Sequence, residues 1–270
     1  MAEACLRLPV RCTCMRADTH RQAQRRNNAS QKLSAFVPLT LKLSLLGITV
    51  DLLVRCIFFK YVKTMGNKKE CNLRSALFFI GDKELIPDLA KVLLYAHSVH
   101  SVLYQKIGEL IGGNAAEVIL LSDEWRLLLP IRTKKSSDWE DRLLLLKDNE
   151  LFGMPNVVRY LVRYSLDTGK WDIRNAVLEF FKDLKDPNFN QMPDLLRSII
   201  KRSRNNSIGA NQIKKACMEL SLINRVDSLI AELKAAGFMS PKLGPLVEAS
   251  MLGVPLYELN PSLFPPEINA

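Results

Sequence analysis

The sequence lacks the short motifs that mark the common enzyme families. It has no Gly-x₄-Gly-Lys-Ser/Thr loop for nucleotide phosphates, no Gly-x-Gly-x-x-Gly after a strand, and no Gly-x-Ser-x-Gly turn around a nucleophile. Histidine, the commonest general base and a frequent zinc ligand, occurs only three times in 270 residues. We therefore predict a non-enzymatic protein with no cofactor.

Few residues could hold a metal ion. His97 and His100 stand three residues apart on an expected amphipathic helix. An enzyme that uses these two histidines is the least favoured hypothesis for this chain. They would need Cys or carboxylate partners, and the nearest helical positions carry leucine and tyrosine. Asp138, Glu140 and Asp141 could bind a hard cation, but carboxylates are also favoured at a helix N-terminus. We predict no metal site.

The six cysteines do not form a disulfide framework. Cys5, Cys12 and Cys14 could be combined with His20 into a zinc site, but Cys-x-Cys departs from the usual spacing of zinc ligands. Cys71 and Cys217 are expected to be small buried side chains. A reducing, cytoplasmic location is the corresponding prediction.

Positive charge is unevenly distributed along the chain. The net charge is +10, yet residues 1–64 contain eleven basic and only three acidic residues, so residues 65–270 are nearly neutral. Any field that attracts nucleic acid must therefore arise from the N-terminal extension or from a local patch.

The extension is also strongly apolar at residues 33–62, although Lys42, Asp51 and Arg55 interrupt the run. Three interpretations stay open. Residues 1–64 are a targeting peptide, a membrane-associated helix with basic flanks, or an upstream extension that precedes a true start at Met65. Membrane association is expected only if residues 33–62 are expressed.

The rest of the chain indicates a mainly α fold with a small β component. Apolar residues recur at helical spacing from Leu89 to Leu110, and Gly112-Gly113 would end that helix. Residues 118–121 and 125–131 resemble a β-hairpin, with Pro130 at an edge. Further helices are expected after Asp138, Pro155 and Asp172, and at residues 193–204. We predict an extension at 1–64, a helical domain with one β-hairpin at 65–190, and a separate domain at 191–270.

Residues 207–240 carry the clearest functional pattern. Ile213 to Leu220 and Val226 to Leu233 form two apolar helix faces around the short turn Leu222-Ile223-Asn224, and Gly237 can end the second helix. With residues 193–204 as a first helix and 238–259 as a wing, the segment resembles a winged helix-turn-helix domain. The closing stretch VPLYELNPSLF resembles uncharacterised prokaryotic, especially archaeal, protein families, which implies no activity.

A cationic run without acidic residues precedes this helix pair. We predict that a regulator-like protein binds double-stranded DNA here, with six cations on phosphates and two residues near bases. The phosphate-binding set is Arg197, Lys201, Arg202, Arg204, Lys214 and Lys215, and the base-reading pair is Asn224 and Arg225. The alternative is a protein-interaction or scaffold module that binds a protein partner or forms a homodimer.

Overall fold

The computed structural model describes residues 67–131, 139, 144–242 and 255–264. The proposed zinc ligands, the apolar segment 33–62 and the N-cap at Asp138 lie outside these residues. The predicted fold class is confirmed, because the chain is mainly helical with two small antiparallel sheets. In the described ranges, no helix combines the length and apolar character that a bilayer-spanning segment requires.

Residues Asn72–Ala270 form one compact unit. Its first part is helical through residue 76, followed by the 3-10 helix η3 (Leu77–Ile80). We call residues 86–153 the N-terminal module. It contains α4 (Ile86–Ser98), β1 (Ser101–Leu103), α5 (Tyr104–Ile111), η4 (Gly112–Asn114), α6 (Ala115–Glu124), β2 (Leu129–Pro130) and β3 (Leu151–Gly153).

Two helices, α7 (Asn156–Thr168) and α8 (Ile173–Asp183), and the 3-10 helix η5 (Phe189–Gln191) lead to the C-terminal module, residues 192–259. This module contains α9 (Met192–Arg202), β4 (Ser207–Gly209), α10 (Ala210–Glu219), η6 (Ile223–Arg225), α11 (Val226–Ala236), β5 (Met239–Lys242) and β6 (Leu256–Leu259). A last 3-10 helix, η7 (Pro261–Leu263), follows.

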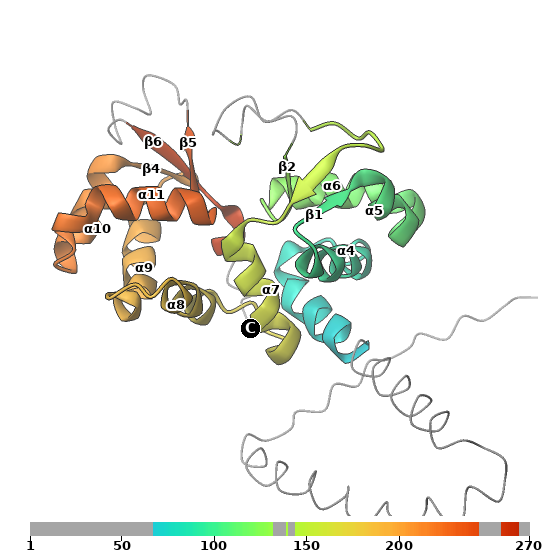
Figure 1. Cartoon of the computed structure of the whole chain (residues 1–270), viewed down its shortest axis with the longest axis horizontal. Coiled ribbons are helices and arrows are strands. Elements are labelled where there is room, and N and C mark those ends of the chain that lie inside the picture. The colour runs from blue at the N-terminus through green and yellow to red at the C-terminus, as the bar shows by residue number, and fades with distance from the viewer. Residues whose placement is uncertain (1–66, 132–138, 140–143, 243–254, 265–270) are drawn as a thin grey trace, which may run out of the picture. The chain divides into compact units, whose positions relative to one another are not determined.

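The two modules repeat one order of elements (Figure 1). Each runs helix, strand, helix, 3-10 turn, helix, strand, strand. In each sheet the third strand lies between the other two, which gives the orders β1-β3-β2 and β4-β6-β5 with antiparallel pairing throughout. The chain therefore contains a structural repeat that no sequence period reveals.

The single long helix expected from Leu89 to Leu110 is wrong. Helix α4 ends at Ser98, and residues 101–103 pair with β3 before α5 begins. Arg159 of α7 stabilises this break by donating to four carbonyl oxygens at the end of α4, on Ala96, His97, Val99 and His100, at 2.9–3.2 Å. A guanidinium with several donors satisfies the carbonyls that a helix C-terminus leaves without partners.

The expected β-hairpin at residues 118–131 is also wrong in its first half. Ala115, Val118, Ile119 and Ser122 are buried at helical spacing in α6. Only Leu129–Pro130 forms a strand, and Pro130 lies on an edge of the sheet, as predicted. The helix expected after Asp138 is absent from residues 144–153, which form an irregular segment and then β3.

Local signals placed the later helices correctly. Helix α7 follows Pro155 and ends at Gly169, and the Asp172 side chain caps α8 by accepting from the Asn175 amide at 3.0 Å. Gly237 ends α11 in the left-handed conformation, with φ of 80°. A continuous apolar core runs through both modules, and within it the rings of Phe180, Phe181 and Phe238 contact one another in edge-to-face and tilted arrangements.

Candidate nucleic-acid interface

The predicted phosphate-binding residues lie on α9, on the turn at 203–206 and, after β4, on α10. Ser198 and Arg202 of α9 both contact the carboxylate of Glu219 at the end of α10, with Ser198 Oγ 2.7 Å from Glu219 Oε2. These contacts join the C-terminal end of α9 to that of α10.

Four of the six cations are exposed and form no ion pair within the described residues. They are Lys201, Arg204, Lys214 and Lys215. Their charges are therefore available to a phosphate backbone, which pairs with Lys and Arg in a salt-dependent way.

The other two cations already have carboxylate partners. The Arg197 guanidinium lies 3.1 Å from Asp194 one turn earlier in α9, and Arg202 pairs with Glu219. Although Asp194 and Glu219 flank the cationic run in sequence, the fold places both carboxylates against it. The net positive charge of this face is smaller than the sequence suggests.

Arg225 lies in an internal network. Its Nη1 is 2.8 Å from Asp186 Oδ1 and 2.9 Å from Asn188 Oδ1, and its Nη2 is 2.6 Å from Asp186 Oδ2. The side chain of Asp186 is only 4% exposed. The hydrogen bond from Arg225 is the main reason that the pKa of Asp186 lies below its ordinary value. Arg225 therefore ties the start of α11 to the segment before α9.

The solvent face of α11 carries little positive charge. Asn224 is exposed in η6, but the described exposed side chains of α11 include Asp227 and Lys234, and Glu232 is partly exposed beside Arg225. Because specific base contacts usually come from Arg, Lys, Asn or Gln, only Asn224 remains of the predicted base-reading pair.

The N-terminal module presents a different surface. Helix α6, the counterpart of α11, exposes Glu117, Leu120 and Glu124, and Leu120 is 52% exposed. Across the sheet, Leu103 pairs with Leu151, and the Ile131 amide donates to the Leu151 carbonyl at 2.8 Å.

Side chains at paired positions lie on one face of a sheet, so these three aliphatic residues form a row. Leu103 and Ile131 are 38% and 46% exposed. No sequence pattern indicates this apolar face, since only the strand register brings the three positions together.

Within the described residues, the structure brings no set of metal ligands together around His97 and His100. His97 lies in the last turn of α4 and His100 just after it, and both supply backbone carbonyls to Arg159. No group of three or more His, Cys, Asp or Glu side chains in the described ranges could hold a metal ion. Cys217 is buried as expected, whereas Cys71 is only partly buried.

A protein-family model matches residues 89–265, which is more than half of the chain. The match spans both modules and the two helices between them. No curated protein and no solved structure matches the chain.

Proposed function

The chain belongs to the uncharacterised protein family whose model matches residues 89–265, and from its geometry we propose that it binds double-stranded DNA through phosphate contacts. The observation that carries this proposal is the set of four exposed cations on α9, the following turn and α10 that form no ion pair within the described residues. We further propose that the C-terminal module is a winged helix, with α10 and α11 as its helix-turn-helix pair and β5 and β6 as its wing strands.

The element order supports the winged-helix proposal. Helices α10 and α11 are joined by a short 3-10 turn, and α11 leads directly into an antiparallel pair of strands. Helix-turn-helix proteins place their second helix in the major groove and use the preceding helix against the backbone. The cations of α10 and of the end of α9 suit that second role.

The charge distribution favours binding with low sequence specificity. Arg225 is held by Asp186, and α11 exposes an acidic residue early in the helix, so base recognition has few donors. Four phosphate contacts correspond to a slope of log K against log salt of about −3.6. The affinity should then fall about 100-fold between 50 and 200 mM salt, since the slope acts on a fourfold change in concentration.

A salt titration of the full chain with a labelled duplex tests the proposal. We expect K214Q/K215Q to halve the slope, so that affinity falls only about tenfold over the same salt range. The matched control is K83Q/K147Q, which removes two exposed lysines near or within the N-terminal module. No binding of the duplex at 50 mM salt, or equal slopes for the two double variants, would contradict the proposal.

A second candidate function, self-association or partner binding, rests on the row of Leu103, Leu151 and Ile131, in which Leu103 and Ile131 are exposed and Leu151 is partly buried. Contiguous apolar surface on a folded protein commonly marks an interface. If a homodimer forms through this face, light scattering should give twice the monomer mass, and L103K/I131K should give the monomer. A monomeric wild type that captures no partner would refute this candidate.

A further inference from the structure

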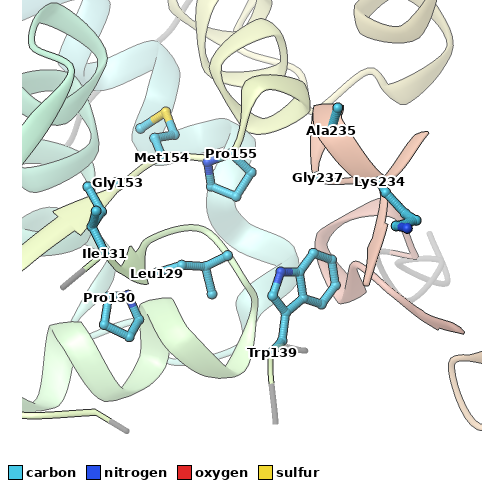
Figure 2. A pocket seen from close by; sticks show the side chains of 10 residues that line it. All are labelled: Leu129, Pro130, Ile131, Trp139, Gly153, Met154, Pro155, Lys234, Ala235 and Gly237. Atoms are coloured by element: carbon cyan, nitrogen blue, oxygen red, sulfur yellow. The ribbon is translucent and has the colours of Figure 1, made fainter. Parts of the chain in front are cut away.

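A pocket of about 350 Å³ lies where the two modules meet, and ten residues line it (Figure 2). We propose that it binds a small molecule with an apolar body and a single carboxylate. The N-terminal module and the residues just after it supply one wall, with Leu129, Pro130, Ile131, Trp139, Gly153, Met154 and Pro155, and the end of α11 supplies the other, with Lys234, Ala235 and Gly237. This volume lies in the range that small ligands occupy.

The wall from the N-terminal module is apolar. It combines aliphatic side chains, the indole of Trp139 and two prolines, which have no backbone N–H to donate. Figure 2 shows the side chains of Leu129 and Trp139 lining the space. A ligand that buries an apolar body against this wall would be stabilised in proportion to the area removed from water.

The opposite wall supplies one charge. Lys234 is the basic residue in the last turn of α11, its side chain is exposed, and it has no ion-pair partner in the described part of the chain. None of the ten lining residues that the structure describes is acidic. A single cation beside an apolar wall selects an anionic group on an otherwise apolar ligand, and a carboxylate accepts hydrogen bonds from an ammonium group.

Several contacts hold the two walls in place. Gly237 approaches Pro155 so closely that an added Cβ would lie 2.6 Å from the Pro155 Cβ. The Trp139 amide donates to Ser240 Oγ at 3.1 Å, and Arg126 Nη2 donates to Glu258 Oε1 at 3.2 Å. The two hydrogen bonds cross from one module to the other, so the pocket exists before a ligand binds. A preformed site avoids part of the ordering cost of binding.

This proposal is independent of DNA binding, because Lys234 lies outside the cationic set on α9 and α10. The test uses 3-phenylpropionate and its uncharged analogue 3-phenylpropionamide as probes for the full chain. Binding is followed by tryptophan fluorescence, since Trp139 lines the pocket, and W139F identifies the signal that comes from that site.

We expect the acid to saturate at millimolar concentration or below and the amide to bind about two- to fivefold more weakly, as an exposed ion pair allows. K234M keeps the aliphatic side chain and removes the charge, so it should weaken only the acid. K214M, on α10, is the matched control and should bind both probes like the wild type. I131W should block both probes by filling the space.

Two results would overturn the proposal: no saturable signal from the acid up to 20 mM, or K234M binding the acid as tightly as the wild type does. The unfolding midpoint of each variant shows whether it is folded. If I131W is unfolded, the comparison of K234M with K214M still decides the question. Loss of DNA binding in K214Q/K215Q with unchanged probe binding would separate the two proposals.

Discussion

Replacing Arg225 tests whether this residue acts in folding or in DNA recognition. In the R225M variant the Asp186 carboxylate, which is 4% exposed, loses the donors at 2.6 and 2.8 Å. Among the described residues it keeps the Asn188 amide as a donor at 2.7 Å. Removing one partner of a buried ion pair costs roughly 3–5 kcal/mol. Arg225 is 25% exposed, so water can partly replace it, and we expect a loss of about 2–3 kcal/mol.

Urea unfolding measures this loss. With a slope of about 2–3 kcal/mol per molar, the midpoint of R225M should fall by about 1 M relative to the wild type. The double variant D186N/R225M should be destabilised by less than the two single losses combined, because no buried charge is left without a partner. Folded R225M should bind duplex DNA as the wild type does. A midpoint within 0.2 M of the wild type would refute the structural role.

The effect should also depend on pH. The pKa of Asp186 in the folded protein lies below its ordinary value of 3.8, mainly because Arg225 donates to the carboxylate. A lowered pKa contributes stability that is fully present above the unfolded value and is lost as pH falls through the folded value. The difference between wild type and R225M should therefore be constant near neutral pH and shrink below about pH 4. A difference that grows on acidification would contradict this assignment.

Sequence patterns correctly predict the helix ends that depend on residues within one turn of them. The cap at Asp172, the proline before α7 and the glycine after α11 act within one helical turn, so the sequence alone locates them. The break between α4 and α5 has distant causes. Strand β1 pairs with β3 almost 50 residues later, and the four carbonyls at the end of α4 accept from Arg159, about 60 residues away.

The sequence predicts a strand within what is helix α6, because a short apolar run fits either structure. Val118-Ile119-Leu120-Leu121 has no clear period of its own, and β-branched residues favour strands on propensity alone. The fold resolves the ambiguity by burying Val118 and Ile119 while exposing Leu120, as one face of a helix requires. Tertiary packing decides such segments.

The sequence locates the cations of the candidate site on helices and does not show how many of their charges are paired. Lys201, Lys214 and Lys215 are exposed on α9 and α10. The pairing of Arg202 with Glu219 and of Arg225 with Asp186 joins residues 17 and 39 positions apart, which no local pattern indicates. The sequence therefore overestimates the charge available to a nucleic acid.

Three further variants test the C-terminal ends of α4, α7 and α11. R159M should destabilise the fold by about 2–4 kcal/mol in urea unfolding, since four carbonyls at the end of α4 lose their donors. Gly237 and Gly169 both end helices with positive φ, of 80° and 72°. An added Cβ at Gly169 has no neighbour closer than 3.6 Å, so G169A should cost only the backbone strain of about 1–2 kcal/mol. At Gly237 the same atom would lie 2.6 Å from the Pro155 Cβ, and overpacking adds about 1–3 kcal/mol to that strain. Because the clash falls between the modules, G237A should also weaken binding of 3-phenylpropionate while G169A does not. Equal midpoints for the two glycine variants would show that the approach of α11 to Pro155 is not a tight contact.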